Sequence, residues 1–117
     1  MKRAAVLVLV LLAGCGGETA PGTDTETGLR FAVGGNLLTV AATRDMPAGV
    51  RTQLEGRRVL ATCDVPGTEL ATLPKTWDDV DEPFTTTLQA KRPVDLAAEA
   101  TRCRLELGGR VFASAKP

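Results

Sequence analysis

Two cysteine-containing segments with alternating apolar and polar residues constrain this fold more than any other feature of the sequence. Residues 57–65 read RRVLATCDV, and residues 101–107 read TRCRLEL. Successive side chains of an extended strand point to opposite faces, so such alternation indicates a half-buried strand. Cys63 and Cys103 both fall on the apolar face of their segment. The sequence therefore predicts two strands whose cysteines point into a core.

Further short segments carry the same strand pattern. Gly34-Gly35-Asn36 separates two apolar runs and predicts a hairpin with a glycine-containing turn. Gly108-Gly109 follows the second cysteine segment and predicts that the chain turns back there as another hairpin. The additional predicted strands are residues 29–33, 37–42, 84–90 and 110–115.

One short helix is predicted between these strands. Pro47 is suited to a helix start and Gly56 to the position just past a helix end, with Val50 and Leu54 one turn apart on the buried side. The rival interpretation is a turn at residues 46–49 followed by irregular chain. Residues 66–83 are rich in proline, threonine and aspartate and predict a long connection.

The first fifteen residues have the pattern of an export signal. Lys2 and Arg3 precede an apolar run from Ala4 to Ala13. As a helix this run would span about 15 Å, whereas a bilayer core is about 30 Å thick, so it predicts a cleaved signal peptide and not a lasting transmembrane helix. The run ends in Leu12-Ala13-Gly14-Cys15, which resembles the lipobox of bacterial lipoproteins.

This resemblance implies a lipid anchor and sets the domain boundaries. It implies that Cys15 carries a diacylglycerol thioether, that the chain is cut after Gly14, and that residues 1–14 are removed. Residues 16–28 read GGETAPGTDTETG and lack apolar periodicity, which predicts a flexible segment. The expected organisation is a signal peptide over 1–14, a lipidated cysteine and tether over 15–28, and one small β-rich domain over 29–117.

The cysteine count agrees with this arrangement. The chain has three cysteines, and an odd number in an exported protein requires an explanation. If Cys15 is lipidated, Cys63 and Cys103 remain as one pair. A disulfide persists in an oxidising compartment, and joining two inward-facing strands would staple them across the core.

These elements together predict a mainly β fold. The expected architecture is a small disulfide-stapled antiparallel β-sandwich with at most one short helix. It is loosely similar to an immunoglobulin domain, but Trp77 follows the first strand cysteine on a predicted loop, and Thr101 stands where a tyrosine would be expected. The alternative is an α+β domain with the helix near residues 47–55 covering an antiparallel sheet.

The sequence excludes several kinds of chemistry. It contains no histidine, which excludes a Ser-His-Asp triad, a Cys-His pair and a histidine-ligated zinc site. It also lacks the glycine-rich motifs that cradle phosphates. A formal net charge of zero argues against nucleic-acid binding. No catalytic residue, metal or cofactor is predicted.

Three local features remain as candidate contacts. Trp77 lies between Pro74 and Pro83, and the shortage of aromatic residues favours a place in the core. If exposed instead, it would mark a partner site. The acidic run WDDVDEP lacks a calcium-loop pattern and predicts a solvated loop. The arginines of the last hairpin predict a charged solvent face; they are Arg102, Arg104 and Arg110.

The sequence therefore predicts where the protein is located more specifically than what it does there. The sequence predicts a non-enzymatic envelope lipoprotein on the extracytoplasmic side, held to the bacterial membrane through Cys15, whose domain binds an unidentified protein or envelope polymer or serves a structural purpose. The alternatives are an exported enzyme of unfamiliar type and a small-ligand carrier. About 90 residues leave little room for the enclosed cavity that a carrier needs.

Overall fold

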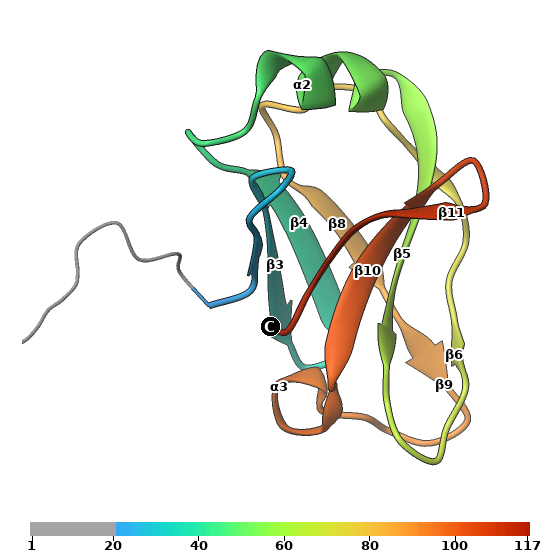
Figure 1. Ribbon diagram of the computed structural model, residues 1–117. Coiled ribbons are helices and arrows are strands. Elements are labelled where there is room, and N and C mark those ends of the chain that lie inside the picture. Colours follow the sequence, from blue (N-terminus) through green and yellow to red (C-terminus); the bar gives the residue numbers. More distant parts are fainter. Residues whose placement is uncertain (1–20) are drawn as a thin grey trace, which may run out of the picture.

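Two four-stranded antiparallel sheets packed face to face make up the domain, in a computed structural model that describes residues 21–117 (Figure 1). One sheet has the order β11-β10-β5-β7, the other β2-β3-β4-β8, and β6 pairs with β9 as a short third sheet. The strands are β2 (Thr23–Asp24), β3 (Leu29–Gly34), β4 (Leu37–Ala42), β5 (Arg57–Asp64), β6 (Leu70–Ala71), β7 (Lys75–Trp77), β8 (Phe84–Thr87), β9 (Gln89–Ala90), β10 (Arg102–Leu107) and β11 (Arg110–Ala115).

The core lies between the two sheets and confirms the predicted alternation. Val59, Ala61 and Cys63 on β5 are buried, while Arg58 and Asp64 are exposed. Thr62, which lies opposite Arg104, departs from this alternation because it is buried as well. The inward side chains of both sheets form one apolar cluster. The mainly β fold expected from the sequence is therefore the fold observed. The largest fully buried side chains include Phe31, Leu29, Leu38, Leu105 and Val40.

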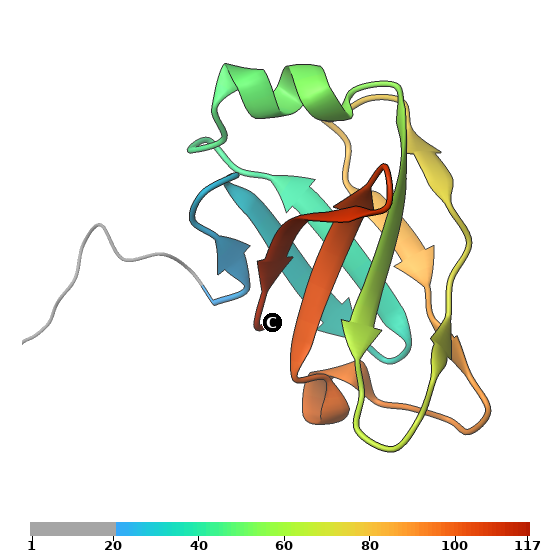
Figure 2. The same cartoon turned by 45° about the vertical axis from the view of Figure 1, so that its right-hand side comes forward.

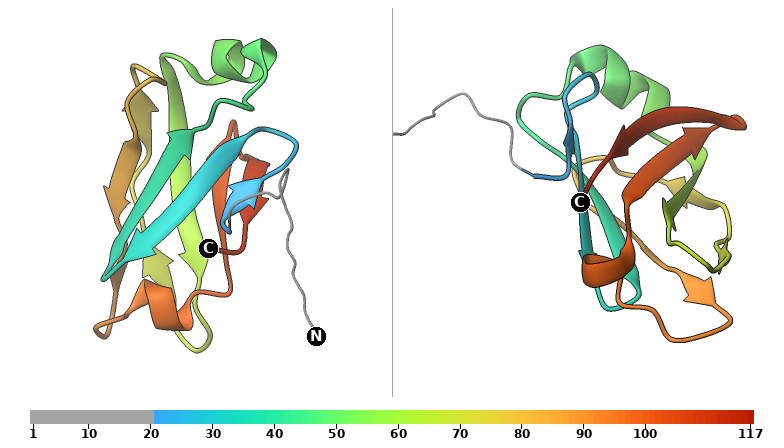
Figure 3. Two further views of the ribbon diagram at one scale, coloured as in Figure 1. Left: turned by 90° about the vertical axis from the view of Figure 1, so that its left-hand side faces the viewer. Right: turned by 60° about the horizontal axis from the view of Figure 1, so that its bottom comes forward.

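A helix lies at each end of the sandwich (Figure 3). Helix α2 (Ala48–Leu54) begins after Pro47 and buries Val50 and Leu54, as the sequence predicts. Helix α3 (Leu96–Glu99) is not predicted by the sequence and adds a second short helix. Its N-cap Asp95 accepts a hydrogen bond from the Ala97 amide, and Leu96 is completely buried. Leu96 therefore attaches this helix to the rest of the domain, through its buried side chain and through its amide, which donates a hydrogen bond of 2.9 Å to the Gly35 backbone oxygen.

The connection over residues 66–83 contains two strands that the sequence did not indicate. β7 pairs with β5, with Arg57 opposite Trp77, and β6 pairs with β9. Both strands are short and lie among prolines and threonines, so neither shows the alternating pattern that signals a strand. β7 nevertheless forms the edge of the disulfide-bearing sheet.

The domain begins earlier than the predicted boundary at residue 29. Thr23 and Asp24 form β2, which pairs with β3, and Gly22, Thr27 and Gly28 are buried. Gly28 has a φ of +73°, and a Cβ there would lie 2.6 Å from the Met46 Cα. The expectation of a flexible tether up to residue 28 is therefore wrong for residues 22–28. This segment is held by hydrogen bonds and by Gly28, which permits close packing of the backbone. Neither feature can be recognised from the spacing of apolar residues.

Asp24 fastens this segment to the far end of the chain. Its Oδ1 accepts hydrogen bonds from the amides of Glu26 (2.9 Å) and Thr27 (3.2 Å), and its Oδ2 accepts one from the Ser114 amide (2.8 Å). Ser114 lies on β11, which runs beside β2 (Figure 2). One carboxylate thus closes a turn and bridges the neighbouring edges of the two sheets.

We expect Asp24→Ala to lower the free energy of unfolding by about 2 kcal/mol, because hydrogen bonds to a charged group contribute about 1.5–3 kcal/mol. Denaturant unfolding of the mature chain measures this change. Glu26→Ala is the matched control, since it removes an exposed acidic side chain from the same loop and keeps the backbone hydrogen bond to Asp24. Equal stability of the two variants would contradict the role of Asp24.

Candidate functional site

The disulfide joins Cys63 and Cys103, as predicted, but within one sheet. Cys103 lies directly opposite Cys63 in the register of β10 and β5, and their Cα atoms are 3.9 Å apart. Both cysteines are buried. The expectation that the bond would cross the core between sheets is therefore wrong. Two inward-facing residues on neighbouring strands share the same side of their sheet, so inward orientation alone does not distinguish the two arrangements.

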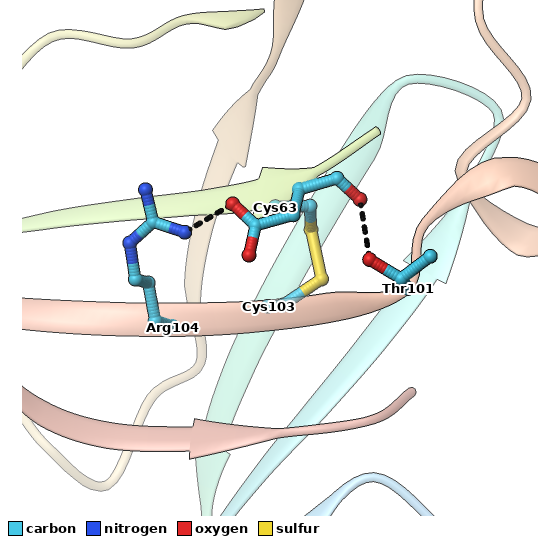
Figure 4. Close-up of a disulfide and its surroundings, with 5 residues drawn as sticks. Cys63, Thr101, Cys103 and Arg104 are labelled. Carbon is cyan, nitrogen blue, oxygen red and sulfur yellow. Dashed lines mark hydrogen bonds and ion pairs between the residues drawn. A yellow bond between two sulfur atoms is a disulfide. The ribbon is translucent and has the colours of Figure 1, made fainter. Parts of the chain in front are cut away.

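Polar residues flank the disulfide along β5 and β10 (Figure 4). The Arg104 guanidinium pairs with Asp64 and Glu106, and the Thr101 hydroxyl donates a hydrogen bond of 3.3 Å to the backbone oxygen of Asp64. The hydrogen bond to Asp64 raises the pKa of Arg104 above its ordinary value. Asp64, Thr101 and Arg104 border a surface hollow of about 420 Å³, and their mutual pairing predicts a structural role for the group.

Trp77 lies in the core and not on a partner surface. Its side chain is only 3% exposed, and its ring centroid lies 5.7 Å from that of Phe84. The indole Nε1–H donates a hydrogen bond of 2.9 Å to the backbone oxygen of Glu82. The prediction of a core position is confirmed, and the alternative of a partner contact at Trp77 is wrong.

The acidic run after Trp77 forms a solvated turn. The Asp79 Oδ1 accepts a hydrogen bond of 2.9 Å from the Asp81 amide, and Asp81 pairs with Arg51 of α2. Within residues 21–117, no group of three or more histidine, cysteine or acidic side chains could hold a metal ion. The run thus serves to connect β7 and β8 beside the end of α2.

The outward side of the β2-β3-β4-β8 sheet carries almost no charge. Register alignment places Thr39 between Ala32 and Thr85 on this side, and the hydroxyls of Thr39 and Thr85 lie 3.4 Å apart. Arg30 is the single charged residue among the outward-facing positions of these four strands, and the Lys75 ammonium lies at the β8 edge, where it donates a hydrogen bond of 3.1 Å to the Thr85 backbone oxygen. We call it the threonine face, formed by Thr23, Arg30, Ala32, Gly34, Leu37, Thr39, Ala41, Thr85 and Thr87.

Two exposed leucines lie at one end of the threonine face, Leu37 within it and Leu73 beside it. Leu37 is 45% exposed and lies opposite Thr87, and Leu73 is 82% exposed on the segment between β6 and β7. Leu73 and Thr87 line a shared hollow of about 330 Å³. Exposed apolar groups on a surface depleted of charge are characteristic of contact surfaces.

The opposite outer surface of the sandwich differs in kind. Its outward residues on β5 and β10 include Arg58, Asp64, Arg102, Arg104 and Glu106. This confirms a charged solvent face for Arg102 and Arg104, and Arg110 is exposed at the start of β11. The Arg102 guanidinium donates a hydrogen bond of 3.2 Å to the Ser114 hydroxyl. The two faces of one small domain thus present unlike chemistry, which makes the threonine face the candidate functional surface.

The sequence alone does not reveal this surface, although part of its signal is present. The run Thr85-Thr86-Thr87 stands in a predicted strand, and Leu37 and Thr39 alternate with buried residues. The sequence does not indicate that β8 pairs with β4, because these strands lie more than 40 residues apart in the chain. Only this pairing brings the threonines together.

Comparisons with known proteins give no relative from which to transfer a function: no family model, curated protein or solved structure matches the chain. Cys15 and the rest of the predicted lipobox lie outside the residues that the structure describes. Among residues 21–117, no helix is long and apolar enough to cross a membrane.

Proposed function

We propose that this protein is a bacterial envelope lipoprotein, anchored to the membrane by lipid on Cys15, and that its domain is a non-enzymatic binding or structural module. The lipobox-like run Leu12-Ala13-Gly14-Cys15 and the preceding apolar segment support export and lipidation. The threonine face supports a role in contact with another envelope component. Charge-paired arginines and a buried disulfide offer no reactive group that would favour catalysis.

The Cys63–Cys103 disulfide is the observation that carries this proposal. A buried disulfide suits an oxidising, extracytoplasmic compartment. It also accounts for two of the three cysteines in the chain, so the third is the one that completes the lipobox-like run. The odd cysteine count then has an explanation in which each of the three cysteines has a role.

The physics of the anchor agrees with a permanent attachment. One acyl chain binds a membrane only marginally, whereas two chains hold a protein stably. A diacylated Cys15 would provide both chains on one residue. The protein would then be anchored to the membrane without spanning it.

We expect Cys15→Ser to abolish lipidation and processing. The lipid is attached through the sulfur atom, so the variant should keep residues 1–14 and its unmodified precursor mass. Intact-mass analysis of the membrane fraction should give, for the wild-type chain, a mature protein that begins at Cys15 and carries a diacylglycerol mass.

Thr19→Ser is the control, because it alters the exported chain and leaves Leu12 to Cys15 unchanged; its processing should match that of the wild type. An unmodified Cys15 in the wild-type protein, or cleavage several residues beyond it, would refute the proposed anchor. The outcome for the domain is independent, since its disulfide and fold do not involve Cys15.

A further inference from the structure

The point at which the chain enters the domain lies on the edge of the sheet that bears the threonine face. β2 begins at Thr23 and is the edge strand of that sheet. Six residues separate Cys15 from Gly22, and an extended chain of this length reaches at most about 25 Å. A lipid on Cys15 would therefore keep this sheet within a short distance of the headgroups.

The threonine face is too small to hold a free protein partner stably, which favours a target that the tether already keeps close. Three strands spaced about 4.8 Å apart, with five residues along each, give a surface of roughly 250 Å². A stable protein interface buries about 800 Å² on each partner. A surface that is tethered close to its target needs little intrinsic affinity, because a short linker gives a high effective concentration.

The chemistry of the face suits a lipid surface. Defined by its nine residues, it contains no acidic side chain that anionic headgroups would repel, and the exposed Arg30 can pair with phosphate. Threonine hydroxyls can donate hydrogen bonds to phosphate and ester oxygens. Leu37 is exposed opposite Gly34 and Thr87, at the other end of β3 from the residues that pair with β2, and the exposed Leu73 borders the hollow beside Thr87. Both leucines can therefore enter the apolar boundary of a membrane at this end of the face.

We propose that the threonine face lies against the lipid headgroups of the membrane that holds the anchor, with Leu37 and Leu73 inserted at its border. This inference rests on the proposed lipidation of Cys15 and adds a fixed orientation to it. The charged outer surface of β5 and β10 then points away from the membrane, toward the aqueous extracytoplasmic space.

The test compares dyes on the two faces of the lipidated protein. Thr87→Cys and Leu73→Cys each place a thiol for a polarity-sensitive dye on or beside the threonine face. Thr76→Cys is the matched control, because Thr76 is also an exposed threonine but lies on β7 opposite Arg58. The proteins are purified with their lipid and reconstituted into vesicles of phosphatidylglycerol and phosphatidylethanolamine.

In vesicles, the dyes at positions 73 and 87 should shift to the blue and be quenched by nitroxide-labelled lipid, whereas the dye at position 76 should do neither. Adding Leu37→Glu and Leu73→Glu to the Thr87→Cys protein should return its dye to aqueous emission while the protein stays bound through its lipid. Unchanged melting temperatures of the labelled proteins show that folding is intact.

Two results would overturn the orientation and leave the anchor in place: equal quenching at positions 76 and 87, or a shift at position 87 in native membranes but not in lipid vesicles. The second would identify a protein as the occupant. A mass spectrum without diacylglycerol would instead refute the proposed function, so the two failures are distinguishable.

Discussion

Trp77→Ala is expected to lower the free energy of unfolding by about 3–5 kcal/mol, as is usual when a buried large aromatic is truncated. Trp77 fills the space beside Phe84 and satisfies the backbone oxygen of Glu82. The variant loses both the packing and the hydrogen bond. Equilibrium unfolding in denaturant measures the change, and a single tryptophan makes its fluorescence an unambiguous probe of the wild-type protein.

Trp77→Phe keeps part of the packing. It retains an aromatic ring in the core but removes the indole N–H donor and the volume of the second ring, so we expect a loss smaller than that of Trp77→Ala, about 1–3 kcal/mol. The folded wild-type protein should emit at short wavelength and resist aqueous quenchers. Red, easily quenched emission together with an unchanged stability of Trp77→Ala would contradict the buried position.

The paired substitution Cys63→Ala and Cys103→Ala is expected to cost roughly 2–5 kcal/mol, the usual range for loss of a native disulfide. The bond spans 40 residues of chain, and chain-entropy models give about 4 kcal/mol for a loop of that length. Both residues are buried, so their loss also leaves a small cavity. Thermal and denaturant unfolding of the mature chain provide the measurement.

Reduction of the wild-type protein should reproduce this loss, because it breaks the same cross-link without changing the sequence. Reductant added to the double variant is the control and should have no effect. A thiol assay on the exported domain, in denaturant without reductant, should detect no free thiol from Cys63 or Cys103. Two reactive thiols there would rule out the bond.

The sequence predicted the elements whose signal is local. β5 and β10 were identified because buried and exposed side chains alternate along them, and α2 because Pro47 and Gly56 mark its ends. Such features depend on neighbouring residues alone. The sequence does not indicate α3, because Leu96 is the one buried residue of this helix. A single buried residue produces no periodic pattern.

Long-range pairing accounts for the errors. The inward cysteines were identified, but whether they lie on adjacent strands or on opposite sheets depends on strand order, which alternation does not encode. The same holds for the threonine face, since Thr85 joins Thr39 only through the β4–β8 pairing. Asp24 gives the clearest case, because its partner Ser114 lies 90 residues away.

The bridge made by Asp24 also determines how the domain would respond to mechanical force. A pull on the chain before residue 22 enters the protein through β2, where Gly22 accepts a hydrogen bond of 2.7 Å from the Phe31 amide. The load then reaches Asp24, which passes part of it to β11 through Ser114. A protein tethered at this end would thus share the strain between both sheets, and rupture would begin at the Gly22 and Asp24 contacts of β2 while the disulfide-bonded strands stayed intact.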